Sequence, residues 1–159
     1  ALVEGEAAAL AASYITDEEL ASLKQSLYDM ADDNESGDLA DGAADRRFHQ
    51  IIAGATRNNM LVNIIEQMWH VRNNVPQVFQ AYKSICDIDG TQRVAEHQEI
   101  YEALVNRDAN AARSAMHEHF AQILDKLIAT SEAEQIEQAR QRARAVRERF
   151  SLDHLVNGS

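Results

Sequence analysis

The stretch DRRFHQII, at positions 45–52, decides the fold expected for this chain. In a helix, Asp45, Phe48, His49 and Ile52 fall at i, i+3, i+4 and i+7 and therefore share one face. That face is apolar except for one carboxylate and one imidazole. The rest of the chain repeats this pattern of helical periodicity with polar side chains on an inward face.

Residues that interrupt helices are scarce. The chain has 159 residues, with one Pro and six Gly, and no stretch alternates with the period of a β-strand. Its length suits one domain with a hydrophobic core. We therefore predict an all-α fold, a single antiparallel helical bundle of about six to seven helices.

Capping signals and breakers predict where the helices lie. Thr16 with Glu19, and Ser131 with Glu134, have the spacing of capping boxes, Asp108 can cap a helix, and Pro76 should end one. The predicted helices cover about 1–13, 17–32, 38–56, 59–74, 77–86, 90–106, 109–130 and 131–150, with a loop at 33–37. We expect one domain over 1–150 and a loose tail over 151–159.

Charge and cysteine content exclude several classes of protein. Asp and Glu number 26 against 15 Lys and Arg, for a net charge of −11, and there is one Cys. A disulfide framework and a cysteine-based zinc finger are excluded, and a nucleic-acid surface over most of the chain is disfavoured. With no signal peptide and no membrane span in view, we expect a cytoplasmic protein. The chain begins at Ala1 without Met, which suggests a fragment or processed product.

The last predicted helix differs in charge from the rest. It carries five arginines, at positions 140, 142, 144, 147 and 149. A basic helix can contact nucleic acid, but on so acidic a chain a solvated face, or packing against a partner such as a second subunit, is favoured.

Two more histidines replace apolar residues on inward faces. His97 falls in the stripe of Val94, Ile100 and Leu104, and His119 falls in that of Met116. His117 lies about 160° from His119 around the helix, so His119 is favoured as the inward residue.

Asp45, His49, His97 and His119 together suggest a metal site. Neutral imidazoles and a carboxylate suit Zn, Ni, Mn or Fe, and a cation would compensate a buried Asp. Taken singly, each His also fits an ordinary core or surface position, and Asp45 with His49 also fits a local hydrogen bond.

Two arginines also face inward. Arg72 continues a stripe with Leu61, Ile65 and Met68, and Arg93 lies one turn before His97. Guanidinium groups beside a metal would bind a carboxylate, although each Arg alone could equally pair with a Glu. Of two further histidines, His70 lies on a polar face and is predicted to be solvated, and His154 lies in the tail.

These motifs resemble a known family. DRRFH at 45–49, Asn58, RVAEHQEI at 93–100, AARSAMHEHF at 111–120 and the opening LVEGEAA at 2–8 are similar, in order and spacing, to the C-terminal effector-binding (FCD) domain of GntR-family regulators of the FadR subfamily. The likeness covers roughly residues 1–130.

The resemblance implies both a metal site and an effector. Asp45, His49, His97 and His119 match the ligands of a divalent cation (Zn, Ni or Mn), while Arg93 and Asn58 match residues that contact a small carboxylate effector. It also implies a homodimer and an N-terminal winged helix-turn-helix that binds DNA. No such segment is present, so we expect DNA binding only through a missing N-terminal half, and no membrane partner.

A finer resemblance concerns the effector. EQMWHVRNN at 66–74 and AYKSICDIDG at 81–90 look like the hexuronate-responsive regulators of the subfamily. This would make the effector a sugar acid bound with the help of Arg72 and Trp69. Lactate, other hydroxy acids and amino acids serve related domains.

Two other functions compete with effector sensing. Three imidazoles and a carboxylate with an open coordination position would also suit an all-α metal-dependent hydrolase, although a di-iron site is disfavoured because the repeated Glu-x-x-His motif is absent. A metal that only braces a dimerisation bundle is the third reading.

Overall fold

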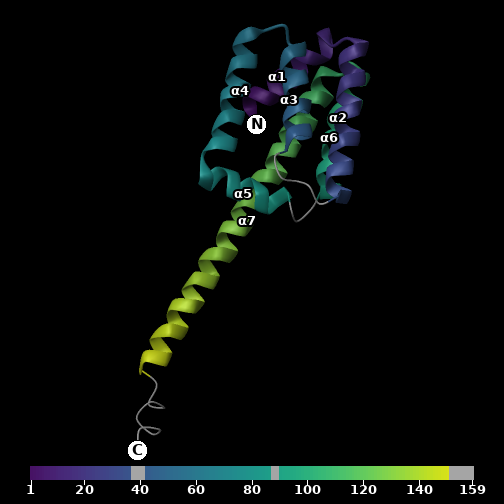
Figure 1. The fold of residues 1–159 in the computed structure, drawn as a ribbon. Helices are drawn as coiled ribbons and strands as arrows, with labels where there is room; N and C mark the ends of the chain where they lie inside the picture. Colours follow the sequence, from purple (N-terminus) through teal and green to yellow (C-terminus); the bar gives the residue numbers. More distant parts are fainter. Residues whose placement is uncertain (37–41, 87–89, 151–159) are drawn as a thin grey trace, which may run out of the picture. The chain divides into compact units, whose positions relative to one another are not determined.

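Helices and the short connections between them make up the part of the chain that the structure describes. A computed structural model describes residues 1–36, 42–86 and 90–150, and within them it has seven α-helices and no strand. The helices are α1 Leu2–Tyr14, α2 Asp17–Ser36, α3 Ala43–Ala55, α4 Asn59–Asn74, α5 Pro76–Cys86, α6 Gly90–Val105 and α7 Ala109–Phe150 (Figure 1). The all-α prediction is confirmed.

Most helix ends follow the predicted signals. Thr16 and Glu19 form the expected capping box, with the Glu19 N–H donating to Thr16 Oγ1 and the Thr16 N–H to Glu19 Oε2. The Asn58 side chain caps α4. Helix α4 ends at Asn74, as predicted. The next residue, Val75, is extended because a residue before proline avoids helical geometry.

Two predicted boundaries are wrong, and a third lies outside the described residues. Helix α2 continues to Ser36, through part of the predicted 33–37 loop. The predicted start of α3 near residue 38 lies outside the described residues, and the described helix begins at Ala43 after a left-handed Gly42. No break occurs at Ser131, where α7 continues to Phe150, because Ser and Glu are tolerated inside a helix when no Gly or Pro interrupts it.

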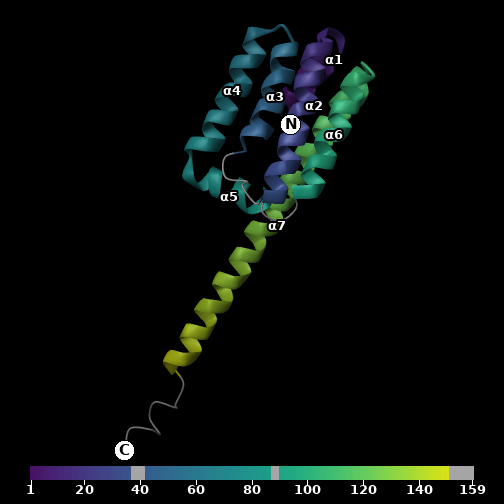
Figure 2. The same ribbon diagram turned by 45° about the vertical axis from the view of Figure 1, so that its right-hand side comes forward.

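The chain divides into two compact units, Ala1–Leu124 and Asp125–Ser159. In the first unit, α3 packs against α1, α2 and α4, while α1 also packs against α6 and α4 (Figures 1 and 2). The core is built from fully buried side chains that include Leu23, Met30, Phe48, Ile100 and Leu104. In the second unit, residues 125–150 complete α7, and every side chain from 131 to 150 is exposed.

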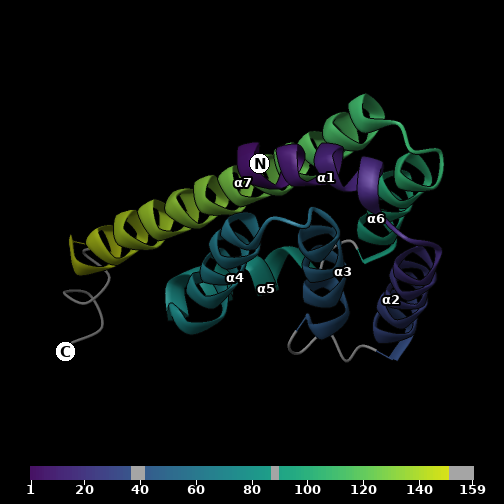
Figure 3. The same ribbon diagram turned by 90° about the horizontal axis from the view of Figure 1, so that it is seen from above.

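Helix α1 lies against the first turns of α7 (Figure 3). Arg113 on α7 pairs with Glu6 on α1 at 2.7 Å. A Cβ placed on Gly5 would come within 2.2 Å of His117 Nε2. Glycine at this position therefore lets α7 approach α1 closely.

Two arginines hold the corner between α1 and α2. Arg57 and Arg107 follow α3 and α6 and have left-handed backbone angles, φ 56° and 54°. Arg57 donates to Glu19 and Arg107 Nη1 donates to the Ile15 carbonyl at 2.8 Å. Asn58 and Asp108 come next in the chain and cap the following helices. The α3–α4 and α6–α7 connections therefore have the same arrangement, in which a left-handed Arg is followed by a residue whose side chain caps the next helix.

Candidate metal centre

Three imidazoles meet in the interior of the first unit. His49 on α3, His97 on α6 and His119 on α7 are each at most 3% exposed. One ring nitrogen from each lies within 4.8 Å of the others. Helix α3 and the later consecutive helices α6 and α7 thus bring together the three histidines predicted from their inward positions.

Asp45 joins this cluster one helical turn before His49. Its Oδ1 lies 2.9 Å from His97 Nε2 and 3.4 Å from His49 Nε2. Asp45 is 4% exposed, so its charge must be compensated by nearby groups. The four residues predicted as ligands therefore lie around one point.

The other ring nitrogen of each histidine is engaged on its outer side. His49 Nδ1 contacts Glu4 Oε2, His119 Nδ1 lies 2.8 Å from Glu96 Oε2, and His97 Nδ1 lies 2.7 Å from the Arg93 carbonyl oxygen. Neutral imidazole has one N–H and one acceptor nitrogen. An acceptor at Nδ1 keeps the proton there and leaves the Nε2 lone pair facing the centre.

This donor set fits a divalent transition metal. Three imidazole nitrogens and one carboxylate oxygen suit zinc, nickel or manganese. Outer partners for metal-bound histidines are what such sites usually provide. The residues present thus fit the predicted cation.

Electrostatics differ among the members of the cluster. Burial opposes ionisation of Asp45, but Arg72 and the hydrogen bonds of His49 and His97 outweigh it and hold its pKa well below the usual range. Burial lowers the pKa of His49, but the carboxylates of Glu4 and Asp45 overcome this effect and raise it to about 10. Burial dominates at His119 and lowers its pKa to about 4, despite the bond to Glu96.

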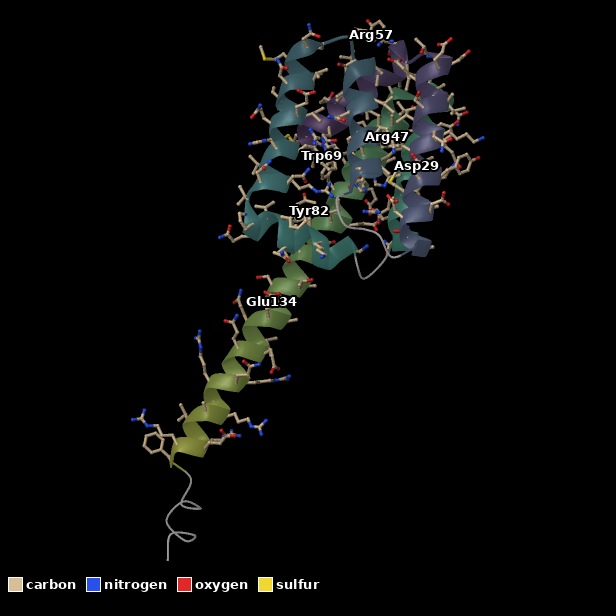
Figure 4. All side chains as sticks on the ribbon, in the orientation of Figure 1. Asp29, Arg47, Arg57, Trp69, Tyr82 and Glu134 are labelled. Atoms are coloured by element: carbon tan, nitrogen blue, oxygen red, sulfur yellow. The ribbon has the colours of Figure 1, made fainter. Side chains whose placement is uncertain are left out.

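Arg72 and two aromatic rings form the outer wall. The Arg72 guanidinium carbon lies 4.1 Å from the centroid of the Trp69 ring and 4.5 Å from that of Tyr82. Trp69 is in turn 5.6 Å from the His49 ring. Trp69 and Tyr82 are labelled in Figure 4, toward the space between α4 and α3. Arg72 is thus held by cation–π contacts in a partly buried place.

A small cavity adjoins the cluster. It measures about 50 Å³, and its lining includes His49, Trp69, Arg72, Tyr82 and His119. That is room for a few water molecules. A ligand with the size of a sugar acid would require Arg72 or Tyr82 to move.

The remaining predicted residues lie elsewhere or contribute differently. The Asn58 side chain accepts hydrogen bonds from Met60 N and Leu61 N as the cap of α4. Arg93 contributes its carbonyl oxygen to His97, and its side chain is half-buried. Effector roles for Asn58 and Arg93 stay predictions from the resemblance.

The predictions of which side chains face inward and which face solvent are confirmed for some residues and wrong for others. Arg72 points inward and His70 is exposed, both as predicted, and His154 lies outside the described residues. The buried residues of α4 are Ile65 and Trp69, whereas Met68 is 37% exposed. The predicted stripe through Met68 is therefore wrong by one residue.

Glu4 and Glu96 are members of the cluster that were not predicted from the sequence. Glu4 falls on one face of α1 with Ala8 and Ala11, both buried, so the criterion used for the histidines would have found it. Glu96 precedes His97 directly and lies outside the stripe predicted for His97. It shares a face of α6 with Ile100 and Ala103, both buried, so the same periodicity marks it.

Comparison with known proteins identifies the family. Residues 1–122 match the model of the FCD domain, and the chain belongs to this family, as its motifs indicated. It is 32% identical over 139 residues to the Uxu operon transcriptional regulator of Escherichia coli K12, covering 85% of this chain and 53% of that protein. It is 29% identical over 118 residues to the Exu regulon transcriptional regulator of the same strain, covering 74% and 45%.

A solved structure shows the same fold. The E. coli protein McbR/YncC superposes with a TM-score of 0.72 at 24% identity, covering 82% of this chain and 61% of that one. The chain spans about half the length of the curated relatives it matches. None of the helices in the described ranges is long and apolar enough to cross a membrane.

Proposed function

We propose that this chain is the metal-dependent sensing domain of a bacterial transcription regulator and that it binds a small carboxylate. Asp45, His49, His97 and His119 hold a divalent ion, zinc, nickel or manganese. The observation that carries the proposal is the convergence of these four side chains while each histidine has an acceptor at Nδ1. When bound, the ion joins three helices and supplies positive charge beside the cavity.

The effector binds next to the ion, with its carboxylate on Arg72. The Arg72 guanidinium, held against Trp69 and Tyr82, donates from each terminal nitrogen to Asp45. A guanidinium has five N–H groups, so others remain for the carboxylate of an effector. Arg93 and Asn58 are further candidates from the family resemblance. The effector is a sugar acid such as a hexuronate, or a related hydroxy acid, which is supported by likeness to regulators named for the Uxu operon and the Exu regulon.

Regulation follows from differential affinity. An effector that binds one helix arrangement more tightly shifts the population toward that arrangement. In a cytoplasmic homodimer with an N-terminal winged helix-turn-helix, this shift changes operator binding. The chain itself catalyses no reaction. The alternative of a metal-dependent hydrolase has only the donor set in its favour, whereas the named relatives are regulators.

Metal content tests the first half of the proposal. We expect elemental analysis of purified wild-type protein to find a bound divalent ion, with less in His97→Ala, and a chelator to lower the wild-type Tm. The proposal is wrong if both proteins have equal metal content and equal Tm.

A ligand panel tests the second half. Glucuronate, galacturonate and lactate are compared with glucose, which lacks a carboxylate, in metal-loaded protein. A true effector at about 100 times its Kd stabilises by about 2.7 kcal/mol, or roughly 5–10 °C in Tm for a domain of this size. Arg72→Met should abolish the shift. If no carboxylate acts differently from glucose, the metal merely braces the bundle.

A further inference from the structure

Two buried glutamates stand behind the imidazoles, on the side away from the centre of the cluster. Glu4 on α1 contacts His49 Nδ1, and Glu96 on α6 lies 2.8 Å from His119 Nδ1. They are 4% and 8% exposed. Neither belongs to the four proposed ligands.

We propose, on the basis of the metal site put forward above, that Glu4 and Glu96 are positioning residues of that site. Each carboxylate accepts the Nδ1–H of its histidine and so fixes the ring orientation and the tautomer. The lone pair of Nε2 is then presented to the ion. The negative charge on each glutamate also makes Nε2 of its histidine a stronger electron-pair donor to the ion.

The charge of the cluster supports this assignment. Asp45, Glu4 and Glu96 are three buried carboxylates, and Arg72 is the cation that pairs with Asp45. Metal binding requires the histidines to be neutral, and these four groups then sum to −2, the charge that one divalent cation balances. Buried carboxylates are costly, so a purely structural packing role would be served at least as well by apolar residues of similar volume.

His97 provides an internal comparison. Its Nδ1 faces the Arg93 backbone carbonyl, which no side-chain substitution removes. Loss of either glutamate should therefore loosen one histidine and leave His97 oriented. A partial and graded loss of metal affinity is expected, in contrast to the large loss on removing a ligand.

Glu4 also brings a fourth helix into the site. The three histidines come from α3, α6 and α7, whereas Glu4 comes from the first turn of α1. Metal binding should consequently tighten the packing of α1, which would be measurable as slower amide hydrogen exchange in residues 2–14. Glu4→Gln should weaken this effect, and Glu96→Gln should retain more of it.

Metal affinity is the decisive measurement. Zn²⁺ and Co²⁺ Kd values are determined in competition with a chromophoric chelator for wild type, Glu4→Gln and Glu96→Gln. Exposed neighbours of Glu96 on α6 serve as matched controls, Glu99→Gln and Glu102→Gln. The glutamine variants keep the size and an acceptor oxygen but lose the charge. We expect about 10–100-fold weaker binding in each, an altered Co²⁺ absorption spectrum, and controls within twofold of wild type.

The outcomes are separable. If wild type binds Zn²⁺ and Co²⁺ while both glutamine variants match it in Kd and in Co²⁺ spectrum, the positioning role is wrong and the metal site stands. If wild type binds neither ion, the proposed metal site itself is wrong. The metal-free Tm of every variant is measured alongside. If Glu4→Gln fails to fold, the Kd and spectrum of Glu96→Gln test the positioning role. If Glu96→Gln fails to fold, those of Glu4→Gln test it.

Discussion

Arg72 directs both terminal guanidinium nitrogens, each at 3.0 Å, to a single oxygen of Asp45, Oδ2. The other oxygen, Oδ1, faces His97 and His49. One buried carboxylate is thus divided between a permanent cation on one side and the imidazole cluster on the other. The two halves of the proposed site, for metal and for effector, meet at this side chain.

Arg72→Met should destabilise the metal-free protein far more than the metal-loaded protein. Removing one partner of a buried ion pair costs about 3–5 kcal/mol, because Asp45 is left without Arg72. A bound divalent ion would compensate that carboxylate, so the Tm difference from wild type should shrink on adding Zn²⁺. Thermal denaturation with and without Zn²⁺ checks this, with exposed Arg46→Met as control. A Tm difference unchanged by Zn²⁺ would contradict the expectation.

The capping box of α2 should give a stability term that disappears in acid. Hydrogen bonding to Arg57 lowers the pKa of Glu19 below 4.5 in the folded state. A carboxylate with a lowered folded pKa stabilises above its unfolded pKa and loses that effect as pH falls through the folded value. Urea unfolding should therefore show wild type more stable than Glu19→Gln at pH 7, with the gap closing as the pH falls below 4.5 and through the lowered folded pKa of Glu19.

Thr16→Ala removes the other half of the same cap. It should cost about 1 kcal/mol, and because a hydroxyl does not titrate, its loss of the Glu19 N–H bond should persist at low pH. A Thr16→Ala penalty that vanished in acid together with that of Glu19 would contradict this assignment of roles.

Glycine and alanine at position 107 should separate backbone strain from side-chain bonding. Both substitutions remove the bond from Arg107 to the Ile15 carbonyl, but only alanine keeps the strain of φ 54°. A left-handed residue with a Cβ costs about 1–2 kcal/mol. Arg107→Gly should therefore be more stable than Arg107→Ala by about 1 kcal/mol in urea unfolding. Equal stabilities would show that the left-handed backbone is not maintained.

Gly5→Ala should be harmful only while His117 is present. The new methyl group would lie 2.2 Å from His117 Nε2, so the imidazole must move. In a His117→Ala background the clash is gone, and the substitution should stabilise α1 by about 0.5–1 kcal/mol through helix propensity. A double-mutant cycle measures the coupling. Additive effects would contradict the close approach.

Inward polar residues made much of the cluster predictable from sequence. Asp45, His49, His97 and His119 each interrupt an apolar stripe, and such interruptions need a compensating partner. Which partners provide it depends on how helices cross, which periodicity does not encode. The pairing of Glu96 with His119 on another helix therefore could not be predicted.

Periodicity alone does not decide which of two adjacent apolar residues is buried. On α4, Met68 and Trp69 are adjacent, so a rotation of one residue position exchanges their exposure. The structure buries the larger ring, which stacks on Arg72. The absence of a break at Ser131 has a different cause, because a capping box is also acceptable sequence for a helix interior.

The corner between α1 and α2 has a mechanical consequence. Arg57 and Arg107 reach it from two different helix ends, and it lies at the end of the first unit marked by Arg57 in Figure 4. At the other end, α4 passes to α5 through the single extended residue Val75. If a ligand changes the arrangement of the helices, we expect the corner between α1 and α2 to stay fixed. We expect the largest displacement at α5 and Tyr82.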